Sequence, residues 1–286
     1  QLADFAGIVG AGDVEVYALL RPNVDAHDFE ISPADLDALN RADVILENGQ
    51  GLEPWLDDAV DASGADAPVV DTSEGAHLIH TGHEGRDHEG EDSQGHEGHE
   101  HDHGDVNPHL WHDPTNAEVM VDHTADALAD IAPDAADDIE ARAGAYTAEL
   151  VELDAWITEQ IATLDDPKLV TDHDAFAYYV ERYGLTHVGS VIPSFDSAAE
   201  VSTGDLNDLA DAIEREGVRA IFTEQSLPPK ASEALARRTG AAVVSGTDGL
   251  YGDSLGPEGS GGDTYLDMMR HNTRSIVEHL GSGADG

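Results

Sequence analysis

The longest periodic pattern of apolar residues lies in the middle of the chain. Its members are spaced by three or four residues, as on one face of an α-helix, and they are Ile139, Ala143, Tyr146, Leu150, Leu153, Ile157, Ile161 and Leu164. The spacing predicts one helix over about 133–164, roughly 46 Å long at 1.5 Å per residue. A helix of that length can connect two domains, although a simple core helix gives the same periodicity.

Strand-like and helix-like segments alternate on both sides of this helix. Before it, we expect strands at 14–19, 43–46 and 69–70 and helices at 33–41, 52–63 and 114–131. After it, we expect strands at 168–171, 186–192, 220–222 and 241–245 and helices at 175–183, 203–216, 232–239 and 265–280. This alternation is typical of mainly parallel sheets flanked by helices. The sequence therefore predicts an α/β protein.

One segment interrupts the alternation, at 75–104. It contains eight histidines among Gly, Asp and Glu, and almost no apolar side chains: His77, His80, His83, His88, His96, His99, His101 and His103. Such a composition buries too little surface to order a chain, so we expect a disordered loop. Its histidines suggest zinc capture, although a hydrophilic insert that merely binds offered metal has the same composition.

The charge balance excludes one class of function. The chain has 60 Asp and Glu against 13 Lys and Arg, a formal net charge of −47. A field of that sign repels phosphate backbones, which excludes general nucleic-acid binding. The acidic residues run through segments expected to form helices and strands, such as 121–164 and 205–220, where only salt screens their repulsion. We therefore expect a halophilic protein.

The composition also limits the possible metal ligands and the membrane topology. The chain has no cysteine, so disulfides and thiolate metal sites are excluded. No run of 18 apolar residues occurs, so no membrane-spanning segment is expected within the sequence given.

Three histidines stand just after expected strands or in turns, where α/β proteins place ligand sites. They are His27, His109 and His173, distributed over both halves of the chain. Each alone is more often a structural histidine than a ligand. Together they favour a zinc site between domains, because imidazole suits Zn²⁺. A carboxylate would complete a tetrahedron; Asp253 is the best candidate, but spacing alone does not select it among 60 acidic residues.

A series of ordered segments carries a family resemblance. They are DAHDFEISP at 25–33, ADVILENGQGLEPWL at 42–56, NPHLW at 107–111, TDHDAFAYYVERY at 171–183, IFTE at 221–224, YGDSL at 251–255 and TYLDMMRHN at 264–272. In this order they resemble the metal-binding substrate-binding proteins of ABC importers for zinc and manganese. The resemblance implies an N-terminal α/β lobe at 1–132, a rigid lobe-spanning helix at 133–165 and a C-terminal α/β lobe at 166–286.

The resemblance also implies a ligand set. The two histidine ligands that come first in the family fall on His27 and His109, the third ligand position on His173 and the carboxylate on Asp253. Manganese-type members are expected to carry Glu at the third position, so His173 indicates zinc, in agreement with the preference of zinc for imidazole. Auxiliary or outer roles are expected for Glu30, His112 and Glu224.

The function implied is an extracytoplasmic receptor that binds one Zn²⁺ between its lobes and delivers it to a membrane permease and its ATPase subunit. We expect a monomer that is not an enzyme and that is anchored to the membrane through an N-terminal segment absent from this sequence. The first strand of the N-terminal lobe is also expected to be missing.

Three rival functions remain. They are a manganese or iron receptor of the same family, a passive zinc buffer based on the histidine-rich loop, and a zinc hydrolase. The hydrolase is disfavoured because none of the expected helices carries an HExxH motif and four protein ligands leave no position for water.

Overall fold

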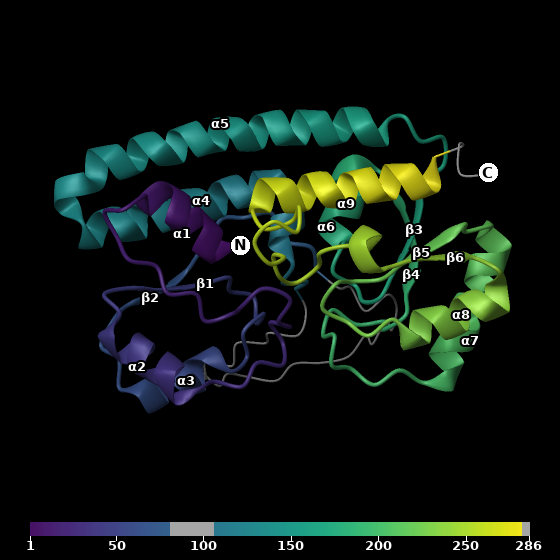
Figure 1. Ribbon diagram of the computed structural model, residues 1–286, viewed down its shortest axis with the longest axis horizontal. Helices are drawn as coiled ribbons and strands as arrows, with labels where there is room; N and C mark the ends of the chain where they lie inside the picture. The colour runs from purple at the N-terminus through teal and green to yellow at the C-terminus, as the bar shows by residue number, and fades with distance from the viewer. Residues whose placement is uncertain (81–105, 282–286) are drawn as a thin grey trace, which may run out of the picture.

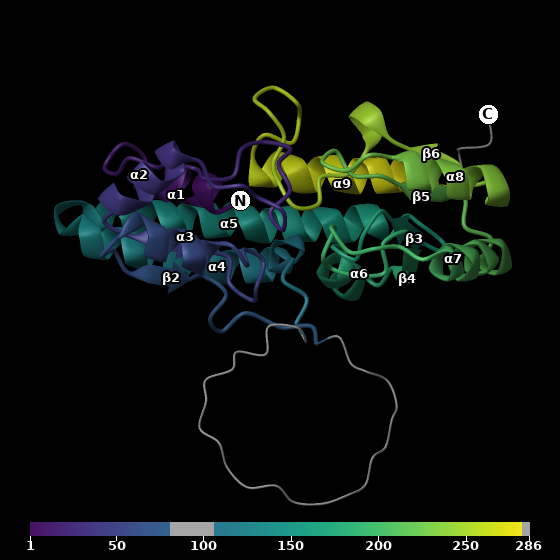
Figure 2. The same ribbon diagram turned by 90° about the horizontal axis from the view of Figure 1, so that it is seen from below.

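Two parallel sheets, one in each half of the molecule, lie below a long helix that runs over both (Figure 1). The computed structural model describes residues 1–80 and 106–281. Figure 2 shows the same arrangement from below, with the long helix behind the helices of both halves. This is the α/β architecture that the alternating pattern predicts.

The N-terminal half contains a two-stranded parallel sheet within the described part of the chain. Its elements are α1 (Leu2–Gly10), α2 (Pro33–Arg41), β1 (Ile45–Glu47), α3 (Leu56–Ser63), β2 (Val69–Asp71), the 3₁₀ turn η1 (Leu110–His112) and α4 (Pro114–Ile131). Helix α2 begins where the sequence predicts, because Ser32 and Asp35 form a reciprocal capping box. A small core of Leu39, Ile45, Leu56 and Ala59 lies between α2, α3 and β1.

The C-terminal half contains a four-stranded parallel sheet in the order β4-β3-β5-β6. Its elements are β3 (Lys168–Thr171), α6 (Ala177–Tyr183), β4 (Thr186–Ser190), α7 (Thr203–Glu216), β5 (Ala220–Phe222), α8 (Lys230–Thr239), β6 (Ala242–Val244), the 3₁₀ turn η3 (Gly246–Asp248) and α9 (Tyr265–Leu280). Because the strands are parallel, all their carboxyl ends lie at one edge of the sheet.

The predicted long helix is present as α5 (Ala136–Ile161), after a 3₁₀ turn η2 (Pro133–Ala135). Its 26 residues correspond to about 39 Å, somewhat shorter than the sequence predicts. Seven of the eight periodic apolar residues are buried, and Leu164 lies beyond its end, partly buried. Helix α5 contacts α1 and α4 on one side and α6 and α9 on the other, so one continuous core connects the two halves.

The prediction of a strand at 14–19 is wrong. Apart from one bridge between Ala11 and Val14, this segment pairs with nothing that the structure describes as a strand. Val16 and Tyr17 are exposed, and the hydroxyl of Tyr17 donates to Asp35 on α2. The alternation of apolar residues here reflects an extended surface connection, because a strand also needs a partner for its backbone groups.

The start of the expected disordered loop also needs correction. Leu78 and Ile79 pack against the main core, the backbone of Ile79 bonds with Asn107, and His80 forms an antiparallel bridge with Val106. Apolar side chains and backbone pairing therefore hold residues 75–80 in place. The rest of the segment lies outside the described residues. Among residues 1–80 and 106–281, none of the helices is long and apolar enough to cross a membrane.

Candidate metal centre

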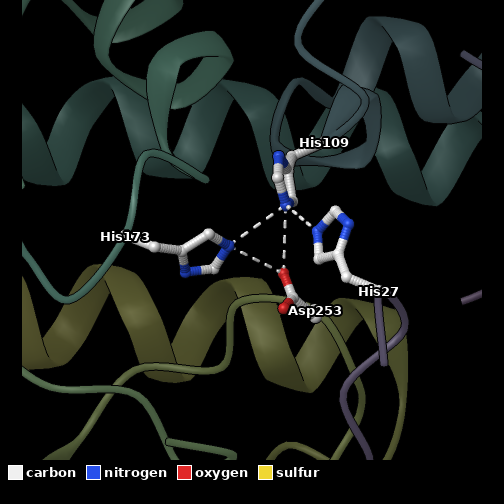
Figure 3. A group of neighbouring side chains, drawn as sticks. All are labelled: His27, His109, His173 and Asp253. Atoms are coloured by element: carbon white, nitrogen blue, oxygen red, sulfur yellow. Dashed lines mark hydrogen bonds and ion pairs between the residues drawn. The ribbon is translucent and has the colours of Figure 1, made fainter. Parts of the chain in front are cut away.

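Four side chains from distant parts of the sequence point toward one another (Figure 3). His27 comes from the loop between α1 and α2, His109 from the residue before η1, His173 from the segment after β3, and Asp253 from the segment between β6 and α9. One ligand atom from each lies within 4.8 Å of the other three. His27 is partly exposed and the other three are buried.

Four of the six separations among these atoms are close to the edges of a small tetrahedron. His109 Nε2 lies 3.3 Å from His27 Nε2, 3.2 Å from His173 Nε2 and 3.1 Å from Asp253 Oδ1. His173 Nε2 lies 3.2 Å from the same carboxylate oxygen. An ion with bonds of about 2.0–2.1 Å to four tetrahedral ligands separates those ligands by about 3.3–3.4 Å. These four separations fit ligands arranged around one small divalent ion.

His109 is held in a defined tautomer by its neighbour Asn107. The amide oxygen of Asn107 lies 2.7 Å from His109 Nδ1 and also accepts a hydrogen bond from the His109 backbone N–H. Nδ1 therefore carries the proton, and the Nε2 lone pair faces the cluster. Burial lowers the pKa of His109 to about 4, although Asp253 opposes the shift. His109 is consequently a neutral ligand at pH 7.

His173 is oriented by a buried carboxylate. Its Nδ1 lies 2.5 Å from Glu224 Oε1, and the backbone N–H of Glu224 donates in turn to Asp172 Oδ2. Burial lowers the pKa of His173, but the carboxylates of Glu224 and Asp253 outweigh burial and hold it well above its usual value. Burial raises the pKa of Glu224 to about 7, with His173 opposing. The pair is the carboxylate–histidine arrangement that supports metal ligands.

Asp253 lies in a closely packed turn. A Cβ on the preceding Gly252 would lie 1.8 Å from Glu224 Oε2, so only glycine fits. The side chain of Asn272 on α9 accepts from the backbone N–H of Tyr251 and donates to its carbonyl, which fixes the turn. Burial raises the pKa of Asp253, but His173 and His109 outweigh it and hold it well below its usual value.

The burial of Asp253 favours a cation in this group. Neither carboxylate oxygen of Asp253 has a hydrogen-bond partner among residues 1–80 and 106–281, although both are buried. A buried carboxylate without a partner is costly, and Oδ1 of Asp253 lies 3.1 Å from His109 Nε2 and 3.2 Å from His173 Nε2. A divalent cation among these atoms satisfies all of them. Its two positive charges match the negative charges of Asp253 and Glu224.

The remaining candidates fall outside this group. Glu30 is exposed and does not join it. His112 is buried between Trp111 and Phe176, with ring centroids 5.6 and 4.3 Å away, and is a packing residue whose pKa burial lowers to about 3. Glu224 reaches the site only through His173.

Of the histidines proposed for metal capture, two are described. His77 pairs with Glu181 on α6 at 2.9 Å and His80 bridges to Val106. The other six lie outside the described residues: His83, His88, His96, His99, His101 and His103.

Of the side chains that orient the site, Glu224 was expected in an outer role, but Asn107, Asp172 and Asn272 were not predicted. Asn107 opens the quoted NPHLW segment and Asp172 directly precedes His173, so both have a local signal. Asn272 on α9 has none, because its contact with Tyr251 depends on how α9 packs.

Comparisons with known proteins agree with the fold and show the family. The family model described as zinc-uptake complex component A, periplasmic (ZnuA), matches residues 1–279. The chain is 31% identical over 288 residues to the manganese-binding lipoprotein MntA of Bacillus subtilis, covering 98% of this chain and 87% of that protein. It is 30% identical over 285 residues to the zinc-binding protein TroA of Treponema pallidum, covering 98% and 86%.

A solved structure of the periplasmic zinc-binding protein TroA from Treponema pallidum has the same fold. Its TM-score is 0.84 at 28% identity, with 98% of this chain and 95% of that chain covered. The predicted resemblance and the two-lobe α/β fold are thus confirmed. The chain therefore belongs to the ZnuA family of zinc and manganese substrate-binding proteins of ABC importers, which are metal receptors and not enzymes.

Proposed function

We propose that this protein is a zinc receptor that binds one Zn²⁺ through His27, His109, His173 and Asp253. The observation that carries the proposal is a group of three imidazole Nε2 atoms and one carboxylate oxygen, in which four of the six separations are 3.1–3.3 Å, close to the edges of a zinc tetrahedron. Three nitrogen donors and one oxygen donor favour zinc over manganese, which prefers oxygen ligands. In this proposal, 1–132 and 166–286 act as the two lobes and 133–165 connects them.

Binding replaces the water shell of the ion by four protein ligands. The neutral imidazoles and Asp253 contribute the lone pairs, and Glu224 compensates the second positive charge through His173. Because four protein ligands complete a tetrahedron, no position is left for an activated water. The ion is therefore cargo, held until the lobes move or a ligand is protonated.

Delivery requires partners beyond this chain. We propose that the receptor works as a monomer outside the cytoplasm, anchored near the membrane, and passes zinc to the permease and ATPase of an ABC importer. The family membership supports this role. The MntA relative of Bacillus subtilis is named a lipoprotein, which is consistent with anchoring. The histidine-rich segment would capture zinc weakly and supply it to the central site.

Manganese remains the second candidate cargo, because relatives with similar identity are named manganese-binding. The test is a competition between equimolar Zn²⁺ and Mn²⁺, with bound metal counted by mass spectrometry. The six capture histidines are first removed by replacing residues 81–105 with an Asn-Gly turn. A two-residue turn suits this position because His80 and Val106, which flank the segment, already form an antiparallel bridge. One retained zinc per chain supports the proposal, and one retained manganese overturns the cargo.

The substitution His173→Glu tests the ligand that favours zinc. It replaces an imidazole donor with a carboxylate and should shift the competition toward manganese. Unchanged selectivity would show that this position does not set the cargo. If the chain lacking 81–105 retains no metal, the histidine-rich segment is the binder and the protein acts as a buffer.

A further inference from the structure

The loop that carries His27 is attached to both halves of the molecule. On its own side, the indole N–H of Trp55 donates to the carbonyl of Ala26 at 2.9 Å. On the opposite side, the backbone N–H of Asn23 donates to the carbonyl of Leu255, two residues beyond Asp253. The loop therefore bridges the N-terminal half to the segment that supplies the carboxylate ligand.

A single carboxylate in this loop connects the ligand backbone to the C-terminal half. Asp25 Oδ1 accepts the backbone N–H of His27 at 2.9 Å, and Asp25 Oδ2 accepts the hydroxyl of Ser197 at 2.5 Å. Ser197 lies between β4 and α7 and is only 8% exposed. Its hydroxyl is thus a buried contact in the opposite half of the molecule, 172 residues away in sequence.

His27 is the ligand best suited to leave first. It is the one partly exposed member of the group in the described part of the chain, whereas His109 and His173 are buried with Nδ1 held by side chains. Figure 3 shows His27 projecting from its own loop, separate from the elements that carry the other three ligands. If the halves separate, the Asp25–Ser197 contact breaks and the turn that fixes His27 loses its support.

From these contacts we propose that Asp25 and Ser197 are positioning residues that control zinc release by holding His27 in the site. The pair breaks when the lobes part, so His27 withdraws before the three buried ligands. The inference rests on the proposed function, because it takes His27 as a zinc ligand.

The experiment measures the rate of zinc release. The full chain is loaded with one equivalent of Zn²⁺ and mixed with excess 4-(2-pyridylazo)resorcinol, whose absorbance reports freed zinc. Ser197→Ala removes only the contact between the halves, and loss of one hydrogen bond to a charged group should accelerate release about tenfold. Ser197→Thr keeps the hydroxyl and should release zinc near the wild-type rate.

Two controls separate positioning from a general structural effect. Ser194→Ala removes a hydroxyl that accepts only from Asp196 within the same segment, so release should not change. In the His27→Ala background, Ser197→Ala should add nothing, since the contact acts through His27. The far-UV circular dichroism spectrum of the metal-free Ser197→Ala chain should match that of the wild type, which verifies that the variant folds.

The outcomes distinguish the two levels of the hypothesis. Wild-type release from Ser197→Ala, or equal acceleration with and without His27, overturns the positioning role while leaving the zinc site intact. If His27→Ala and Asp253→Asn both release zinc at the wild-type rate, the ion is bound elsewhere, and the proposed function fails together with this inference.

Discussion

The four proposed ligands are held in two different ways. His109, His173 and Asp253 are buried on closely packed segments, and Asn107 and Glu224 orient the two imidazoles. His27 lies on a partly exposed loop attached by Asp25, Trp55 and Asn23. Buried ligands with fixed partners favour tight and selective binding, whereas a ligand on a tethered loop favours release. We infer that affinity and release depend on different parts of one site.

The largest effect should come from the carboxylate. Asp253→Asn removes the only charged ligand of the group and leaves a divalent ion without its closest counter-charge. The zinc dissociation constant should rise more than about 100-fold, beyond the upper range for groups outside the coordination shell. Isothermal titration calorimetry with a competing chelator measures it. Asp208→Asn, on the exposed face of α7, is the matched control and should bind as wild type.

A smaller loss is expected when only the support of a buried ligand changes. Glu224→Gln keeps an oxygen that accepts from His173 Nδ1 but removes the negative charge. Zinc affinity should fall about 10–100-fold, measured in the same competition. If the loss equals that of Asp253→Asn, Glu224 is itself a ligand and the division between ligand and support is wrong.

The two buried histidines should respond differently to pH. In the metal-free chain, Glu224 and Asp253 hold the pKa of His173 well above 6.5, so it carries a proton at pH 7 that zinc must displace. Burial lowers the pKa of His109 to about 4, so it carries none. Zinc binding should release one proton, and affinity should rise about tenfold per pH unit near pH 7.

Calorimetry in buffers of different ionisation enthalpy counts that proton. Glu224→Gln removes one of the two carboxylates that raise the pKa of His173, so it should release less than one proton at pH 7. A wild-type chain that binds zinc with no proton release would show that His173 is already neutral in the free protein.

Salt should act on the surface and hardly on the site. The chain has a net charge of −47, and α5 and α7 carry exposed acidic residues such as Asp137, Asp138, Asp208 and Asp211. About 1 M salt screens such charges within roughly 3 Å. The melting temperature should therefore rise between about 0.1 and 3 M KCl. Zinc affinity should change less than about threefold, because the ligands are mostly buried. A melting temperature independent of KCl would contradict the expectation of a halophilic protein.

Local patterns predicted most helices and strands but not every connection. Helix α9 begins and ends where its periodicity predicts, and α7 begins after Ser202, which forms a capping box with Asp205. The prediction of a strand at 14–19 was wrong because alternating apolar and polar residues do not show whether a neighbouring strand is present to pair with the backbone.

The site was predictable only in part, for a similar reason. His27, His109 and His173 could be predicted because they are histidines at the ends of expected strands or in turns. Asp253 could be selected only through the family resemblance, because its turn is fixed by packing against Glu224 and α9. The contact between Asp25 and Ser197 joins residues 172 positions apart and has no local signal at all.

The most direct test of the proposed site is a crystal structure of the zinc-loaded chain, with anomalous difference maps recorded on both sides of the zinc absorption edge. We expect one strong peak at about 2.0–2.1 Å from the Nε2 atoms of His27, His109 and His173 and from a carboxylate oxygen of Asp253. A strong zinc peak elsewhere, with none among these four side chains, would contradict it.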